Sequence, residues 1–229
     1  MLYLIPTPIG NREDITLRAL RLLNELSVLL CEDTRTLRSL CAMYDIPTQH
    51  KTLHSLTSFT NPTMIQHFIS QMKAGDCGLV SEAGTPGLSD PGKEMIKICF
   101  QQNIPFEILP GANALIPAVV GSGFDTKQFV FYGFMPAKKW RNTLLRQIMS
   151  HEIPSFVYES VHRIPKFVSE LQMLQFDGLI SIGREISKLH HQHWTGTLTQ
   201  LTHALSDWSI VCKGERVIGL HPCSTNCTS

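Results

Sequence analysis

The 229-residue sequence lacks the features that mark several large classes of protein. No apolar run reaches the roughly 18 residues that a membrane-spanning helix requires, and Leu2–Ile5 follows the first methionine without a basic region or cleavage site. Lysine and arginine number 20 and aspartate and glutamate 19, so the net charge of +1 provides no overall attraction to nucleic acid. We therefore expect a cytoplasmic protein, with no membrane partner, that binds RNA only through a local basic patch.

Several enzyme motifs are also absent from the sequence. No G-x-G-x-x-G follows the first predicted strand and no G-x-x-x-x-G-K-[ST] occurs, which argues against NAD and ATP sites. Neither a G-x-S-x-G elbow nor an H-E-x-x-H helix is found, so the sequence lacks the motifs of common serine hydrolases and zinc metalloproteases. The remaining enzyme classes are those that need neither a phosphate loop nor a zinc helix.

Histidine and cysteine offer no convincing metal site. His191 and His193 would converge on a strand, but a solvated histidine-rich edge is the favoured interpretation. Seven cysteines occur, and those in apolar contexts, such as Cys31, are expected to be free core thiols. Residues 223–229, which contain two cysteines, are expected to be a disordered tail, and we predict no bound metal.

Short apolar runs alternate with helical patterns through the first half of the chain, which predicts an α/β domain with a mostly parallel sheet covered on both faces. Asp14 is the expected N-cap of the first helix, and Gly75 the expected C-cap of the third. The predicted strands cover residues 2–6, 28–31, 77–81 and 106–109, and the predicted helices cover residues 15–26, 38–44, 64–73, 93–101 and 114–120.

Small and flexible residues collect at Gly121, Ser122 and Gly123, which marks a domain boundary. We therefore predict two α/β domains, covering residues 1–123 and 124–222. The predicted strands of the second domain cover residues 129–133, 155–159, 179–183, 193–195 and 217–220, and its predicted helices cover residues 143–149, 165–174 and 198–205.

Bent or polar segments follow each predicted strand of the first domain. The segment at residues 80–92 is rich in glycine and proline, which permit close approach of backbone to a small molecule. Ligands in α/β sheets bind beyond the carboxyl ends of the strands, so residues 7–14, 32–35, 81–92 and 110–113 are expected to line one pocket.

Nine ordered blocks resemble the ribosomal RNA small subunit methyltransferase I family, a member of the tetrapyrrole methylase superfamily. The resemblance runs from residue 2 to about residue 220. The blocks are residues 2–11 (LYLIPTPIGN), 14–20 (DITLRAL), 31–35 (CEDTR), 81–92 (SEAGTPGLSDPG), 110–111 (PG), 131–136 (FYGFMP), 158–163 (YESVHR), 183–190 (GREISKLH) and 213–215 (KGE).

The resemblance implies two α/β domains of the tetrapyrrole methylase type, with S-adenosylmethionine bound in the cleft between them. It also implies a homodimer that methylates the ribose 2′-hydroxyl of a cytidine in the decoding region of small-subunit (16S) rRNA. Carried over by position, the residues expected at the cofactor are Pro8, Ile9, Gly10, Gly84, Thr85, Pro86, Leu88, Gly111, Ala112, Asn113 and Tyr158.

A ribose hydroxyl is a poor nucleophile, so a nearby base or cation must assist the loss of its proton. The catalytic candidates are Glu32, Asp33, Arg35, Asp90, Glu185 and Lys188. For the first three, a salt-bridged helix start is an equally good interpretation.

RNA contact requires cations beside the cleft. Residues 138–141 combine three positive charges with a tryptophan that can stack on a base, although a solvated helix start is the alternative. The expected RNA contacts are Lys138, Lys139, Trp140, Arg141, His162, Arg163 and Arg184.

Two other functions fit the same fold. One is methylation of a small tetrapyrrole precursor, which predicts a G-x-G-P-G first loop that the sequence does not contain. The other is a non-catalytic RNA-binding or ribosome-binding protein. The sequence also departs from the family at Glu82, where aspartate is usual.

Overall fold

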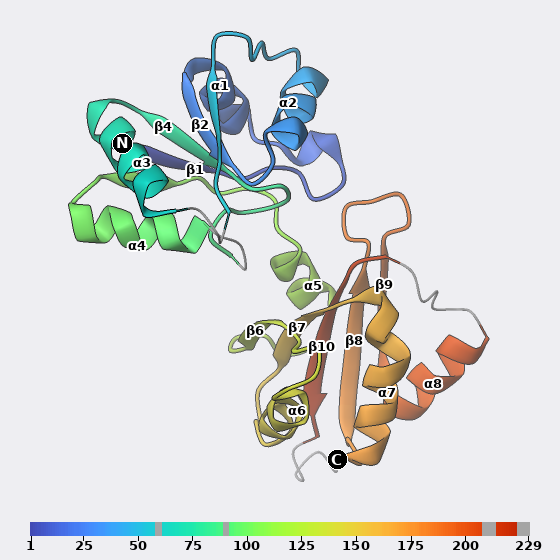
Figure 1. The fold of residues 1–229 in the computed structure, drawn as a ribbon. Coiled ribbons are helices and arrows are strands. Elements are labelled where there is room, and N and C mark those ends of the chain that lie inside the picture. The colour runs from blue at the N-terminus through green and yellow to red at the C-terminus, as the bar shows by residue number, and fades with distance from the viewer. Residues whose placement is uncertain (58–60, 89–91, 208–213, 224–229) are drawn as a thin grey trace. The chain divides into compact units, whose positions relative to one another are not determined.

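The computed structural model divides into two compact units, Met1–Asn113 and Ala114–Ser229 (Figure 1). The division therefore falls after Asn113 rather than after residue 123, because helix α5 (Leu115–Gly121) packs against the sheet of the second unit. The structure describes residues 1–57, 61–88, 92–207 and 214–223.

A five-stranded parallel sheet forms the centre of the first unit, with the strand order β3-β2-β4-β1-β5. The predicted parallel sheet is thus confirmed. One strand, β3, was not predicted because three of the four residues of its sequence, TLHS, are polar and it lies at the sheet edge. The strands are β1 (Leu2–Ile5), β2 (Val28–Cys31), β3 (Thr52–Ser55), β4 (Cys77–Val80) and β5 (Phe106–Ile108).

Helices cover both faces of this sheet because neighbouring strand residues point to opposite sides. Leu29 packs into the core beneath α1 and α2, whereas Leu30 packs into a separate core beneath α3 and α4. Figure 1 shows the two helix pairs on opposite sides of the strands. The helical segments are η1 (Arg12–Asp14), α1 (Leu17–Glu25), α2 (Thr34–Met43), α3 (Pro62–Ala74) and α4 (Gly92–Gln102).

Side-chain caps decide where two of these helices begin. Asp14 was expected to cap α1, but it ends η1, and the Thr16 hydroxyl accepts the Ala19 N–H at 3.0 Å instead. Helix α2 begins at Thr34 rather than at residue 38 because Asp33 accepts the Arg35 N–H at 2.7 Å.

The second unit contains a mixed five-stranded sheet in the order β6-β7-β10-β8-β9. Strands β6 and β7 are parallel, and the other neighbours are antiparallel. The elements are β6 (Val130–Phe134), α6 (Arg141–Met149), β7 (Ser155–Glu159), η2 (Val161–Arg163), α7 (Ile164–Met173), β8 (Gly178–Arg184), β9 (Gln192–Thr197), α8 (Leu198–Ser206) and β10 (Arg216–Pro222).

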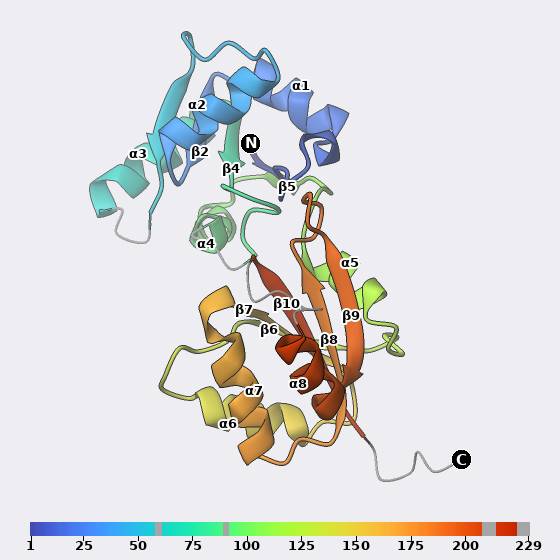
Figure 2. The same ribbon diagram turned by 90° about the vertical axis from the view of Figure 1, so that its right-hand side faces the viewer.

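The second sheet is also covered on both faces. Ile180 and Ile182 of β8 pack into a core with residues of α6, α7 and α8. Gly183 points the other way, and a Cβ built there would lie 3.2 Å from the Cβ of Ala118 on α5. Helix α5 therefore lies on the face opposite the other three helices, as Figure 2 shows.

Candidate functional site

The carboxyl edge of the first sheet contains the topological switch point of the fold. Strand β2 leads through α2 to β3 on one side, whereas its neighbour β4 leads through α4 to β5 on the other side. Connections that leave adjacent strands in opposite directions open a crevice at their carboxyl ends, where ligands bind in α/β folds.

The loop after β1 is joined to the loop after β4 by backbone hydrogen bonds. The Thr7 N–H donates to the Gly84 carbonyl at 2.9 Å, and the Gly84 N–H donates to the Thr7 carbonyl at 3.0 Å. The buried Ser81 hydroxyl also donates to the Gly84 carbonyl, at 2.7 Å, and the Thr7 hydroxyl donates to the Ser81 carbonyl at 3.2 Å. These bonds fix the curved backbone that follows β4.

The loop after β5 joins the same assembly. The Thr85 hydroxyl donates to the Ala112 carbonyl at 3.3 Å. Gly84 has a φ of +80°, and a Cβ built on it would lie 3.3 Å from Ile9 and 3.5 Å from the Ala112 carbonyl oxygen. Three separate segments of the predicted cofactor site are therefore in contact.

The remaining residues expected at the cofactor in this unit border those segments. Pro8 is half-buried, Gly10 is exposed, Pro86 is buried and Leu88 is exposed. A Cβ on Gly111 would collide with the Pro6 ring, so only glycine lets this backbone lie against the end of β1.

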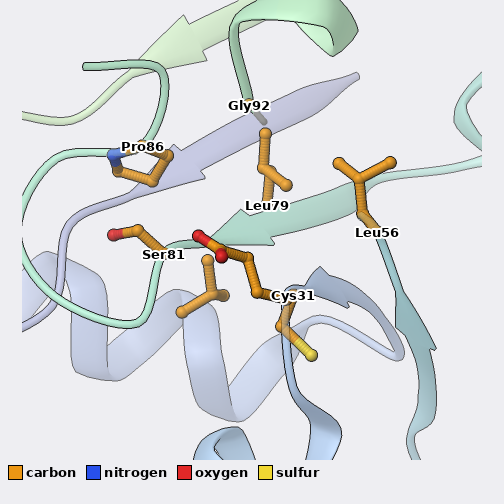
Figure 3. Close-up of a pocket in the computed structure, with 8 residues that line it drawn as sticks. Cys31, Leu56, Leu79, Ser81, Pro86 and Gly92 are labelled. Atoms are coloured by element: carbon orange, nitrogen blue, oxygen red, sulfur yellow. The ribbon is translucent and has the colours of Figure 1, made fainter. Parts of the chain in front are cut away.

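A narrow cleft lies between the carboxyl ends of β2 and β4. Glu32, Pro86 and Gly92 line it, together with Leu56 after β3. Figure 3 shows Ser81 and Pro86 on one side of this cleft and Leu56 on the other. A larger hollow of about 210 Å³ shares Cys31, Val80 and Ser81 with the cleft and extends toward α2. Ser81 belongs to the segment expected here, whereas sequence reasoning missed Leu56 and Met43 because only the packing of strands and helices brings them to this edge.

Asp33 and Arg35 form a closed pair at the start of α2. The Arg35 Nη2 lies 2.6 Å from Asp33 Oδ2, and the Arg35 Nε lies 3.1 Å from both carboxylate oxygens. The side-chain and backbone hydrogen bonds from Arg35 lower the pKa of Asp33 to about 2. Asp33 therefore remains a charged helix cap at neutral pH, which agrees with the salt-bridged helix start.

The thiol of Cys31 lines the same hollow. Burial, followed by the charges of Asp33, Cys41 and Glu82, raises the pKa of Cys31 to about 12. The thiol therefore stays protonated, and its sulfur lies 3.7 Å from the His54 carbonyl oxygen. Asp90, the other catalytic candidate of this unit beside Glu32, lies outside the described residues.

Glu185 and Lys188 form a charged cluster with Glu215 in the second unit. Glu185 Oε1 accepts the Glu215 N–H at 2.7 Å, and the Lys188 Nζ lies 2.9 Å from Glu215 Oε2. Burial alone would raise the pKa of Glu185, but the Glu215 N–H and the Lys188 ammonium lower it overall. Burial alone would lower the pKa of Lys188, but Glu215 and Glu185 raise it overall. Both groups are therefore charged at neutral pH.

Tyr158 belongs to an aromatic cluster on β6 and β7. Its ring centroid lies 4.9 Å from that of Phe131 and 5.1 Å from that of Phe134. Burial raises the pKa of Tyr158, so its phenol stays neutral at physiological pH. Phe134 remains 63% exposed, which leaves this cluster open on one side.

The segment expected to bind RNA, residues 138–141, is exposed except at Arg141. Lys138, Lys139 and Trp140 are exposed, and the Lys139 Nζ lies 5.2 Å from the centre of the Trp140 ring. Arg141 was expected to face RNA but is only 2% exposed, because its guanidinium lies 2.6 Å from both Glu159 and Glu170. The prediction for Arg141 is corrected, since its charge is used inside the unit.

The other predicted RNA contacts differ in how free they are. His162 is exposed. Arg163 is half-buried, with its Nε 2.8 Å from Glu159 Oε1. Arg184 is also half-buried, and its Nη1 donates to the His190 carbonyl at 3.0 Å.

No group of three or more histidine, cysteine, aspartate or glutamate side chains is placed to hold a metal ion within the described part of the chain. The His191 and His193 rings do converge, with centroids 4.7 Å apart. Burial, and then the charge of His191, lowers the pKa of His193. At the tail, the Cys223 N–H donates to the Asp177 carbonyl at 3.0 Å, and residues 224–229 lie outside the described residues.

Comparison with known proteins identifies the family. Residues 1–202 match the family model Tetrapyrrole (Corrin/Porphyrin) Methylases. The chain is 38% identical over 221 residues to the ribosomal RNA small subunit methyltransferase I of Hydrogenobaculum sp. (strain Y04AAS1), covering 96% of this chain and 94% of that protein. The chain belongs to the ribosomal RNA small subunit methyltransferase I family. A protein of the same name from Thermotoga maritima is 35% identical over 221 residues, which cover 93% of this chain and 98% of that protein.

A solved structure supports the fold that the family implies. The uroporphyrin-III C-methyl transferase from Thermus thermophilus, complexed with S-adenyl homocysteine, aligns with a TM-score of 0.59 over 96% of both chains. Its sequence identity of 16% makes this a likeness of fold alone. The predicted family and the tetrapyrrole methylase fold are therefore both confirmed. Among the described helices, none is both long and apolar enough to cross a membrane.

Proposed function

We propose that this protein transfers a methyl group from S-adenosylmethionine to the ribose 2′-hydroxyl of a cytidine in the decoding region of small-subunit (16S) rRNA. The observation that carries the proposal is that three loops meet at the switch-point edge, where hydrogen bonds join Thr7 to Gly84 and Thr85 to Ala112. The names of the relatives support rRNA as the substrate rather than a tetrapyrrole.

The residues at this edge fit S-adenosylmethionine. The cofactor is a nucleoside joined to an amino acid, without phosphate, so it needs close backbone approach rather than a phosphate loop. Gly84 and Gly111 let the loops pack closely against one another, since a Cβ at either position would contact or collide with the neighbouring loop. We propose that the same loops hold the cofactor through Pro8, Ile9, Gly10, Gly84, Thr85, Pro86, Leu88, Gly111, Ala112 and Asn113, with Tyr158 contributing from the second unit.

The bound cofactor supplies a methyl group on a sulfonium, which is transferred by in-line displacement. The main work of the protein is then to orient the acceptor oxygen, and orientation alone lowers such barriers by several kcal/mol. The acceptor must also lose a proton. Ion pairs and hydrogen bonds lower the pKa values of Asp33 and Glu185 and so make both weaker bases, while the raised pKa of Lys188 keeps it protonated. We therefore propose Glu32, which lines the cleft, as the group that receives the proton.

The exposed cations before α6 are the proposed RNA contacts. Lys138 and Lys139 present two charges on one turn, and Trp140 presents an aromatic face 65% exposed to solvent. This combination neutralises phosphate and stacks on unpaired bases. His162, Arg163 and Arg184 are further proposed contacts from the same unit.

Family resemblance also supports a homodimer and a cytoplasmic location. Both stay proposals, and light scattering of the purified chain would measure the first of them. A measured mass equal to that of one chain, at the concentration used for the activity assay, would contradict the proposed homodimer.

The function is tested by incubating the full chain with labelled S-adenosylmethionine and three separate substrates: small ribosomal subunits, naked 16S rRNA, and tetrapyrrole precursors. We expect label in RNA, at the 2′-oxygen of one cytidine that nuclease mapping identifies. Label in the precursors and never in RNA would replace this function with the tetrapyrrole alternative. Absence of S-adenosylmethionine binding in a calorimetric titration would exclude both methyltransferase functions and favour a non-catalytic RNA-binding or ribosome-binding protein.

A further inference from the structure

The larger hollow beside the switch point has the character of a site for a small ring. Its volume is about 210 Å³, which is below the roughly 300–1,000 Å³ typical of pockets for whole drug-sized ligands. Leu37, Leu40 and Met43 of α2 line it with apolar atoms. A single planar base fits such a space better than a complete cofactor does.

Two carboxylates lie at the polar side of the hollow, and only one of them is available. Asp33 receives hydrogen bonds from the backbone and guanidinium of Arg35 on both of its oxygens. Glu82 is exposed, and among the described residues no hydrogen bond or ion pair engages its carboxylate. Glu82 lines the hollow together with Cys31 and Ser81. Glu82 is thus the acceptor that a ligand would meet.

The hollow and the loops proposed for the cofactor lie on different sides of β4. Those loops follow β4, β1 and β5, whereas the hollow lies between β4, β2 and α2. Ser81 belongs to both, since it lines the hollow and its hydroxyl binds the Gly84 carbonyl. A methyl donor bound by the loops and a nucleotide bound in the hollow would meet near the end of β4, beside the cleft that Glu32 lines.

We propose that this hollow receives the base of the target nucleotide and that Glu82 selects cytosine by accepting a hydrogen bond from its exocyclic amino group. The proposal rests on the proposed function, which it extends to the choice of base. A carboxylate accepts from the N4 amino group of cytosine, whereas uracil presents a carbonyl oxygen at the same position and is repelled. The apolar wall formed by Leu37, Leu40 and Met43 contacts the ring without regard to base identity.

The test compares cytidine with uridine at the mapped target position. Small subunits are assembled from transcribed rRNA that carries either base, and kcat/KM for methylation is measured for each. We expect wild type to prefer cytidine and Glu82→Gln to reduce that preference by about 5-fold or more, because the amide donates to the uracil carbonyl. Affinity for S-adenosylmethionine, measured by calorimetry, is expected to be unchanged.

Three further variants separate base selection from general damage. Glu82→Asp keeps a carboxylate and should retain a preference for cytidine. Met43→Ala removes apolar wall and should slow both substrates alike, which leaves their ratio unchanged. Glu25→Gln is the matched control, because this exposed carboxylate lies at the end of α1, shortly before β2 begins and away from the carboxyl edge.

An undiminished preference for cytidine in Glu82→Gln would overturn the proposal. So would a loss of S-adenosylmethionine affinity with the preference intact, because the hollow would then serve the cofactor. Failure of the proposed function looks different, since wild type itself would then methylate neither RNA.

Discussion

The Arg141 guanidinium lies 2.6 Å from the Glu159 carboxylate, and the two side chains are 2% and 0% exposed. Arg141 also donates to Glu170 at 2.6 Å and to the Pro136 carbonyl at 3.0 Å. Because Glu159 ends β7 and Glu170 lies on α7, one cation joins the turn before α6 to two other elements. This buried pair supports the exposed turn that we propose for RNA binding.

Removing one partner of this pair should destabilise the second unit strongly. Glu159→Gln removes one of the two carboxylates that lie 2.6 Å from the buried Arg141 guanidinium, and breaking a buried pair typically costs about 3–5 kcal/mol. Urea unfolding of the full chain measures the loss. Lys166→Met is the control, because this exposed cation lies 3.7 Å from Glu170 and its loss should cost less than about 1 kcal/mol. Equal stability of the two variants would contradict the prediction.

Reversing the exposed charges should weaken RNA binding without affecting the cofactor. The double variant Lys138→Glu and Lys139→Glu is expected to lose about tenfold or more in affinity for the small subunit, with a salt dependence reduced by about two charges. Filter binding at several salt concentrations provides both values. Lys97→Glu with Lys127→Glu makes the same change in net charge at other exposed positions and should bind nearly as wild type does.

Gly84 should tolerate no side chain, whereas Gly75 should. Gly84→Ala forces alanine into a left-handed conformation, which costs about 1–2 kcal/mol, and brings its Cβ close to Ile9 and Ala112. We expect affinity for S-adenosylmethionine to fall about tenfold, as measured by calorimetry. Gly75 has an extended backbone with nothing within 4 Å of an added Cβ, so Gly75→Ala should bind normally. Unchanged affinity in Gly84→Ala would remove this loop from the cofactor site.

Asp33 should titrate far below an ordinary aspartate. Its pKa of about 2 lies below the value of about 3.9 expected in the unfolded chain, so its contribution to stability is complete above about pH 3.9. That contribution is lost as the pH falls toward 2. Carboxyl NMR should show the low midpoint, and Arg35→Gln should raise it because the largest stabilising hydrogen bond is removed. A titration midpoint of Asp33 near pH 4 in the wild-type protein would contradict the Asp33–Arg35 ion pair.

Glu32→Gln should slow methyl transfer without weakening cofactor binding. Proton transfer by a positioned group contributes about 10²–10⁴-fold to such reactions, so a loss of this size in kcat is expected. Single-turnover transfer from labelled S-adenosylmethionine measures it, with Glu25→Gln as the exposed control. A variant with wild-type kcat would exclude Glu32 as the proton acceptor.

Much of the fold could be predicted because its signals are local. The strands Val28–Cys31 and Ser155–Glu159 were predicted at their observed bounds, since each is a short buried run between helical segments. Strand β3 was not predicted because an edge strand with exposed Thr52 and Ser55 has little apolar pattern. The choice of Thr16 over Asp14 as a helix cap depends on backbone geometry, which the sequence of two cap-forming residues so close together does not reveal.

The sequence by itself determined the α/β class, the family, and the glycine-rich and proline-rich loops, because short-range patterns and ordered motifs carry that information. Tertiary structure alone decided which charges are available for chemistry. Arg141 and Lys138 look alike in the sequence, but only Arg141 meets Glu159 and Glu170, which are distant in the chain. Asp33 and Glu82 likewise line the same hollow, but Asp33 is paired with Arg35, whereas no ion pair engages Glu82 among the described residues. Pairing and burial depend on contacts between remote segments, so the folded chain assigns roles that residue type leaves open.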